Sequence, residues 1–188
     1  MDRSNADQNQ AIKEYVDGLR LEEPVTSEDF RTFARATIGD RGLMVYLAWK
    51  ALKKHHPEID AEAVLREACW QFGYIKGERF GDVATPAEWL KNLSSKAGVL
   101  AFDQQFLEMN DERAVKMFRY CPHVEAARSA GATPEELALF CREILMAADV
   151  GTIAPFEDLE IEFPGNTCAE GGQCMMTVTK KRAHAEQP

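Results

Sequence analysis

Residues 99–120, VLAFDQQFLEMNDERAVKMFRY, decide the fold, because the helical spacing of the first half gives way there to a strand pattern. Two strands are expected, Val99 to Met109 and Arg113 to Tyr120. They are joined at Asn110-Asp111, a pair of residues typical of turns. The stretch therefore predicts a β-hairpin in the middle of the chain.

The sequence after the hairpin alternates between helical and strand signals. Residues 121–131 predict a short helix that begins with Cys-Pro and ends at a glycine. Residues 133–136, TPEE, form a capping box that starts a longer helix reaching about Val150. Glu157 to Phe163 and Gln173 to Lys180 predict two more strands on either side of a Gly-rich connection.

The sequence before the hairpin predicts amphipathic helices, each with its own start signal. The expected starts are Thr26 or Ser27, Asp40, Asp60 and the capping box from Thr85 to Glu88. The helix that starts near Thr26 is expected to end at Ile38, so that Asp40 caps the next one. Proline ends that second helix at position 57.

The helix after Asp60 carries two signals about packing. Its apolar residues follow helical spacing and predict a buried stripe. The stripe consists of Val64, Leu65, Ala68, Cys69, Phe72 and Ile75. Gly73 and Gly77 lie four residues apart, and each costs about 1 kcal/mol relative to alanine in a helix interior. We expect them where another backbone, or a ligand, comes close.

Together these patterns predict an α+β fold, with an N-terminal helical half followed by an antiparallel four-stranded sheet with two inserted helices. The expected organisation is an N-terminal helical arm over residues 1–25, a single domain over 26–180 and a disordered tail over 181–188. The length of 188 residues suits one domain with a core of its own.

Composition excludes several functional classes. The formal net charge of −9 repels phosphate backbones, so no nucleic-acid partner is expected. No apolar run approaches the roughly 20 residues that cross a bilayer, so no membrane association is expected. The polar N-terminus, MDRSNADQNQ, does not resemble a secretion signal. Five cysteines, an odd number, do not suggest a disulfide framework, so we expect a cytoplasmic protein with reduced thiols.

Cys121 is the first candidate for chemistry. It lies where a helix cap belongs, and free backbone N–H groups with the positive end of the helix dipole would stabilise its thiolate and lower its pKa. His123 would serve as base or acid. The alternative is that Cys121 is a small buried residue at a strand end.

Cys141, Cys168 and Cys174 form the second candidate group. Cys168 and Cys174 bracket a Gly-rich turn, and Cys141 lies on an apolar helical stripe. Three thiolates that meet at one point would hold zinc, whereas thiols that do not meet would be core residues. Asp149 lies about two turns beyond Cys141 and some 80° around the helix, so it would reach the edge of the same pocket.

Several segments, taken in order, resemble the L-2-amino-thiazoline-4-carboxylic acid hydrolase family from about Thr32 to Lys180. The segments are RTFARATIGDRGLMVYLAWKAL, FGYIKGERFGD, CPHVEAARSAG, ELALFCREI and QCMMTV. The resemblance implies hydrolytic opening of a cyclic thioether–amidine ring. The C-terminal part, with Cys141, Cys168 and Cys174, is also similar to zinc-bearing 4-vinyl-reductase-type domains. Both resemblances imply helices and an antiparallel sheet that enclose a small-molecule pocket.

Three hypotheses follow. In the first, the protein is a small-molecule hydrolase in which Cys121 is the nucleophile or a thiolate that polarises the ligand, and Asp149 or His123 carries the proton. In the second, it is a non-catalytic binding or sensor module with structural zinc on Cys141, Cys168 and Cys174. In the third, it is a scaffold with inert thiols that functions through an interface such as a homodimer.

Overall fold

The computed structural model describes residues 10, 13, 14 and 25–181. The chain divides into two compact units, residues 1–30 and 31–188, and the site lies in the second. Most of the expected N-terminal arm and the tail after Lys181 fall outside the described residues. The expected domain boundaries therefore stay predictions.

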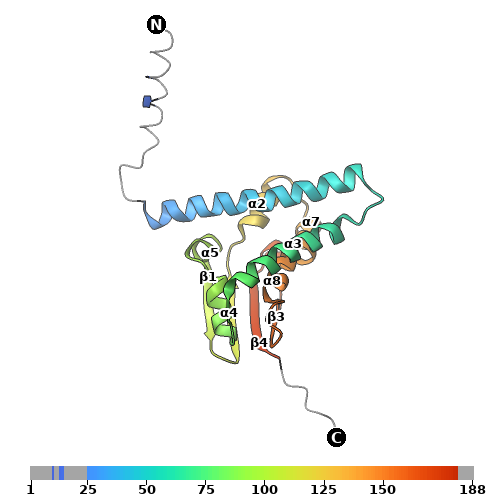
Figure 1. Cartoon of the computed structure of the whole chain (residues 1–188). Helices are drawn as coiled ribbons and strands as arrows, with labels where there is room; N and C mark the ends of the chain where they lie inside the picture. The colour runs from blue at the N-terminus through green and yellow to red at the C-terminus, as the bar shows by residue number, and fades with distance from the viewer. Residues whose placement is uncertain (1–9, 11–12, 15–24, 182–188) are drawn as a thin grey trace, which may run out of the picture. The chain divides into compact units, whose positions relative to one another are not determined.

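Two long helices occupy the N-terminal half of the described chain (Figure 1). Helix α2 runs over Ser27–His55 and helix α3 over Ala61–Gly77. Both predicted caps are confirmed, since the Asp29 N–H donates to Thr26 Oγ1 at 3.1 Å and the Ala63 N–H donates to Asp60 Oδ1 at 2.9 Å. The predicted break at Asp40 is wrong. No proline interrupts this stretch, so one continuous helix satisfies backbone groups that a break would leave exposed.

Short helical segments connect α3 to the sheet. They are η1 (Glu78–Phe80), α4 (Pro86–Leu93) and α5 (Lys96–Ala101). The predicted capping box is confirmed, with Thr85 and Glu88 bonding to each other's backbone N–H groups. The expected strand from Val99 is wrong over its first residues, because the Ser95 hydroxyl accepts the Gly98 N–H at 3.1 Å and caps α5 instead.

Four antiparallel strands form the sheet in the order β1-β2-β4-β3. Their bounds are β1 (Gln104–Met109), β2 (Arg113–Phe118), β3 (Leu159–Glu162) and β4 (Cys174–Lys180). The predicted hairpin turn is confirmed, because Asn110 Oδ1 accepts the backbone N–H of Arg113 at 2.8 Å. The four-stranded antiparallel sheet and the α+β class match the prediction.

The inserted helices lie between β2 and β3, as predicted. They are α6 (Pro122–Ser129), α7 (Pro134–Leu139), the π-helical turn η2 (Phe140–Leu145) and α8 (Met146–Ile153), and a short 3₁₀ turn, η3 (Cys168–Glu170), precedes β4. The expected long helix therefore contains a π segment. Such segments are rare in proteins as a whole, but many of those that occur lie at functional sites.

Two apolar clusters hold these elements together. In one, Trp89 of α4 and Ile153 of α8 pack against Met176 and Val178 of β4. In the other, the aromatic rings of Tyr46, Trp49 and Phe140 lie within 5.5 to 6.3 Å of one another. The first cluster covers one face of the sheet with helices, and the second joins α2 to the helix that contains the π turn.

Close backbone contact between α3 and α8 explains the glycines of α3. A Cβ atom at Gly73 would lie 1.9 Å from the Ala148 carbonyl oxygen, and one at Gly77 would lie 2.3 Å from that of Thr152. In the same way, a Cβ atom at Gly151 of α8 would lie too close to the backbone carbonyl group of Trp70 in α3. The predicted role of Gly73 and Gly77 in close backbone approach is confirmed.

The predicted buried stripe of α3 is only partly correct. Leu65 and Cys69 are packed against the core, but Val64, Phe72 and Ile75 are 46%, 52% and 52% exposed. The buried face of α3 instead runs through its glycines, because those positions meet α8. No helix within the described ranges is long and apolar enough to span a membrane.

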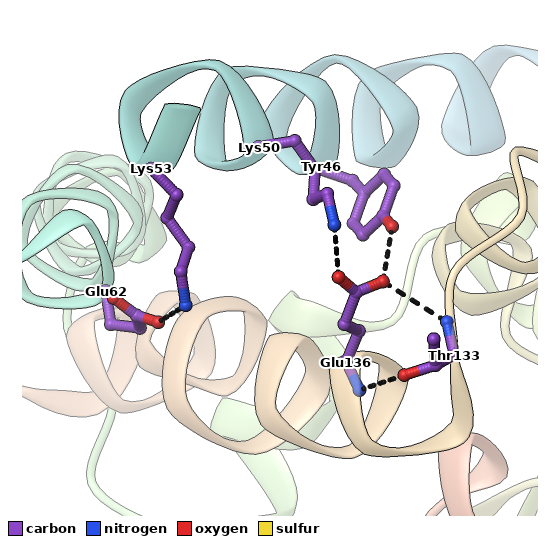
Figure 2. Close-up of polar contacts among 6 residues, drawn as sticks. All are labelled: Tyr46, Lys50, Lys53, Glu62, Thr133 and Glu136. Atoms are coloured by element: carbon purple, nitrogen blue, oxygen red, sulfur yellow. Dashed lines mark hydrogen bonds and ion pairs between the residues drawn. The ribbon is translucent and has the colours of Figure 1, made fainter. Parts of the chain in front are cut away.

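Polar contacts also fix α2 against its neighbours (Figure 2). The Glu136 carboxylate accepts the Tyr46 hydroxyl at 2.9 Å and the Thr133 backbone N–H at 3.2 Å, and it also pairs with Lys50. This confirms the capping box predicted at the start of α7. One carboxylate thus closes the α7 N-terminus and binds α2 at the same time.

Candidate functional site

A cavity of about 650 Å³ opens between the long helices and the sheet. Its walls come from α2, α3, α5, β2, the start of α6, the π turn with α8, and the segment before β4. Apolar side chains from several of these elements line it, among them Leu65, Phe72, Phe118, Met146 and Phe163. Its size falls within the range of ordinary ligand sites, roughly 300–1,000 Å³.

All five cysteines of the chain line this cavity. They are Cys69, Cys121, Cys141, Cys168 and Cys174, and none is in a disulfide. Cys141 and Cys168 each raise the thiol pKa values of Cys121 and Cys174 through charge repulsion, so these thiols lie near one another. The structure therefore brings together thiols that lie on five separate segments of the chain.

The environment of Cys121 differs from the prediction. Cys121 does occupy the N-cap position of α6, with Pro122 as the first helical residue. Burial nevertheless raises the pKa of its thiol far above its ordinary value. The backbone N–H groups of Val124 and His123 act in the predicted direction, but they are outweighed by the loss of solvent. The predicted lowering of the Cys121 pKa is therefore wrong.

The other thiols are affected in the same way. Burial raises the pKa of Cys141 to about 11 and that of Cys174 to about 12, and it also raises the pKa values of Cys69 and Cys168. These thiols are protonated at neutral pH. A thiol that attacks a substrate here needs a base to take its proton.

His123 is one such base within the cavity lining. Burial is the main cause that lowers its pKa to about 4, with Arg41 acting in the same direction, so its imidazole is neutral at pH 7. Its Nδ1 atom is buried without a hydrogen-bond partner. A Cβ atom at Gly42 of α2 would come within 2.5 Å of that nitrogen, so only glycine leaves room for the ring.

Lys116 of β2 and Asp149 of α8 contribute opposite charges to the cavity lining. Lys116 is 1% exposed, and its Nζ donates to Ser94 Oγ at 3.2 Å. Burial lowers its pKa to about 8, although Asp149 favours the protonated form. Burial raises the pKa of Asp149, and the cations of Lys116 and Lys76 oppose that rise. For each of the two groups, burial thus favours the neutral form, whereas the opposite charge of its partner favours the charged form.

Arg41 and Lys76 add positive charge to the same cavity. Both line it, from α2 and α3 respectively. Burial lowers the pKa of Lys76, and Arg41 acts in the same direction, whereas Asp149 raises it. The guanidinium of Arg41 lies 5.8 Å from the centre of the Phe72 ring. Three basic side chains and one acidic side chain therefore share an otherwise largely apolar cavity.

The segment that carries Cys168 is held in place by Arg142 of the π turn. The Arg142 guanidinium donates to the Gly165 carbonyl at 2.8 Å and to Glu170 Oε2 at 2.7 Å. The Cys168 thiol in turn lies 3.5 Å from the Phe118 carbonyl oxygen. These contacts position the loop between β3 and β4 as one wall of the cavity.

Sequence reasoning named six site residues, and all six line the cavity: Cys121, His123, Cys141, Asp149, Cys168 and Cys174. Within the part of the chain that the structure describes, no group of three or more His, Cys, Asp or Glu side chains is positioned to hold a metal ion. Zinc therefore stays a prediction.

Sequence reasoning missed Lys116. The signal was present, because residues two apart on a strand share a face. Lys116 lies two residues from Ala114 and two from Phe118, so the pattern places it on the same strand face as these two apolar residues. A lysine in such a position points toward a core or a cavity.

Comparison with known proteins gives one family. The profile of the L-2-amino-thiazoline-4-carboxylic acid hydrolase family matches residues 36–176. Searches among curated proteins and among solved structures found no match. The similarity of the C-terminal part to 4-vinyl-reductase-type domains stays a prediction. The matched residues include every side chain that sequence reasoning assigned to the site.

Proposed function

The chain belongs to the L-2-amino-thiazoline-4-carboxylic acid hydrolase family, and from this we propose that its thiol-lined cavity binds and hydrolyses a small cyclic substrate in which one ring carbon is bonded to both nitrogen and sulfur. The observation that carries the proposal is the convergence of all five cysteines, His123 and Asp149 on one cavity of ligand size. The pocket predicted from the sequence would then be the substrate pocket.

The charges of the cavity suit the compound in the family's name. That compound carries a carboxylate and a ring carbon bonded to nitrogen and sulfur. Arg41 and Lys76 would bind the carboxylate, because both are basic side chains that line the same cavity. Asp149 would face the amino-substituted carbon, whose amidine-type nitrogens carry positive charge when protonated.

Nucleophilic attack by Cys121 is the mechanism that we propose. Its Sγ forms a bond to the ring carbon while the thiol proton passes to a neighbouring base. His123 is neutral at pH 7 and would accept that proton, and Asp149 in its ionised form is the alternative acceptor. The ring C–N or C–S bond then breaks, with the proton returned to the leaving atom. Water cleaves the Cys121 adduct and regenerates the thiol.

The test is turnover of L-2-amino-thiazoline-4-carboxylic acid by the purified full-length chain, followed by mass spectrometry of substrate and product. Cys121→Ala should abolish ring opening while the melting temperature shows that the fold survives. The matched control is Cys69→Ala, which removes a thiol from the α3 wall and should retain most of the activity. Turnover by a folded Cys121→Ala protein at the wild-type rate would exclude the thiol mechanism.

A second function is favoured by the raised pKa values of the thiols. Protonated thiols in a largely apolar cavity suit a binding or sensor module, with the zinc on Cys141, Cys168 and Cys174 as a further prediction. Saturable binding of a cyclic amidine without turnover would support this alternative. A melting temperature that falls on chelation would support the zinc. A homodimer also stays a prediction, to be tested by the mass of the protein in solution.

A further inference from the structure

Lys116 has no part in the proposed hydrolysis, yet it is one of the least exposed charged residues of the described chain. It lies in the middle of β2, opposite Met176 of β4, and it lines the cavity. Burying a lysine costs free energy unless the amine is paired or loses its proton. A lysine kept in such a place calls for a chemical reason.

The surroundings of the amine are those of a reactive lysine. Its Nζ donates a hydrogen bond to Ser94 Oγ at 3.2 Å and lies 4.9 Å from the centre of the Phe118 ring. The charged groups near it are Lys76 on α3 and Asp149 on α8, with the Cys174 thiol on β4. Desolvation and a second cation are the two conditions that make a lysine nucleophilic near neutral pH.

The size of this effect can be worked out from the pKa. A fall from 10.5 to about 8 raises the fraction of neutral amine at pH 7 by about 300-fold. Only the neutral amine has a lone pair that can attack a carbon atom. At equal access, Lys116 is therefore expected to react far faster than an ordinary surface lysine.

We propose that the Lys116 amine forms an imine with a small carbonyl compound that carries an anionic group, of which a 2-oxo acid is the simplest type. The carbonyl group would meet Nζ, and the anionic group would meet Arg41 and Lys76 across the same cavity. This activity is separate from the hydrolysis proposed above, because it uses a different nucleophile and a different bond.

The chemistry balances with groups that the cavity contains. The lone pair of Nζ attacks the carbonyl carbon and forms a C–N bond, and one of the two amine protons passes to the carbonyl oxygen to give a carbinolamine. Asp149, whose protonated form is favoured by burial, donates a proton to the hydroxyl group. The C–O bond breaks and water leaves, and the second amine proton returns to Asp149, so that the neutral imine remains. Addition of water reverses each step, so the amine is regenerated without an external oxidant or reductant.

The experiment traps the imine in the full-length protein. Pyruvate is added at neutral pH together with cyanoborohydride, and peptide mapping by mass spectrometry measures the reduced adduct at each lysine. Lys116 should be labelled at least tenfold more than Lys91, an exposed lysine on α4 that serves as an internal control. Asp149→Asn should slow the labelling of Lys116 several-fold, and acetone, which lacks the carboxylate, should label it less than pyruvate does.

Two results would overturn the proposal. One is labelling of Lys91 and other exposed lysines with none at Lys116, and the other is equal labelling of all lysines. Lys116→Met, once cooperative melting shows that it is folded, should remove the selective adduct and leave the rest. Because trapping needs no ring opening, its failure leaves the hydrolase proposal intact, and failure of the hydrolase assay leaves the imine proposal intact.

Discussion

Replacing Gly73 by alanine should separate α3 from α8. The new Cβ would lie 1.9 Å from the Ala148 carbonyl oxygen, 2.7 Å from its carbon and 2.9 Å from the Thr152 nitrogen. These are backbone atoms of a helix, so none can rotate away. To restore an ordinary contact of 3.4 Å, the carbonyl oxygen must retreat by about 1.5 Å.

The magnitude follows from two opposing effects. Alanine improves the helix by about 1 kcal/mol relative to glycine. Overpacking costs about 1–3 kcal/mol when side chains can adjust, and more when backbone has to move. We therefore expect Gly73→Ala to lower the free energy of unfolding by about 3 kcal/mol. That corresponds to roughly 6–12 °C in melting temperature for a domain of this size.

Urea unfolding followed by circular dichroism measures this change, and Gly39→Ala is the matched control. Gly39 also lies inside a long helix, but a Cβ there would meet Pro122 and Ala126 at 3.4 and 3.5 Å, which are ordinary contacts. That variant should be neutral or more stable by up to about 1 kcal/mol. Equal effects of the two substitutions would refute the idea that the α3–α8 contact needs glycine.

Three further outcomes are expected. Glu136→Ala should lower the free energy of unfolding by about 2 kcal/mol in urea titrations, because it removes a helix cap and the partner of a buried tyrosine hydroxyl. Glu135→Ala, on the exposed side of the same turn, should cost less than about 0.5 kcal/mol. In the unfolded chain Lys116 keeps its proton up to about pH 10.5, while in the folded chain it releases it near 8. The free energy of unfolding of the wild type should therefore rise as the pH increases from the lower to the higher of these two values. This rise should be absent in Lys116→Met. Arg142→Ala should speed alkylation of Cys168 several-fold while costing no more than about 1 kcal/mol in stability, because the lost ion pair is exposed.

The parts of the fold that sequence predicts well are those marked by local chemistry. The capping boxes at Thr85 and Thr133, the cap at Asp60 and the turn at Asn110 are all present, because each depends on residues within one turn of chain. The order of strands and helices follows from these signals. An α+β fold with a four-stranded antiparallel sheet could therefore be predicted from the residues alone.

The errors occurred where distant contacts decide the outcome. Asp40 resembles a helix cap, but α2 continues through it. Val64, Phe72 and Ile75 follow helical spacing, but the buried face of α3 is the one that its glycines bring against α8. In these cases the local pattern allows two structures, and only the position of another element chooses between them.

The same reasoning applies to the site. The position of Cys121 before a helix correctly predicts nearby N–H groups, but it does not reveal how much protein covers the thiol, and burial has the larger effect on the pKa. That all five cysteines line one cavity could not be deduced from their spacing, because they come from five different segments. Lys116 could have been found from its strand face, yet its charge suggested solvent.

The π turn at Phe140–Leu145 has a consequence for chain length. A π turn accommodates one residue more than an α-helical turn does. A variant with one residue deleted from this segment could form an ordinary α-helix throughout, and its composition would hardly change. The extra residue is taken up within one turn, so the residues beyond the deletion would keep roughly the same angular position about the helix axis. Asp149 would still line the cavity, and Gly151 would still meet α3. The π turn thus lets the chain hold one additional residue beside Cys141 without disturbing the contact between α3 and α8.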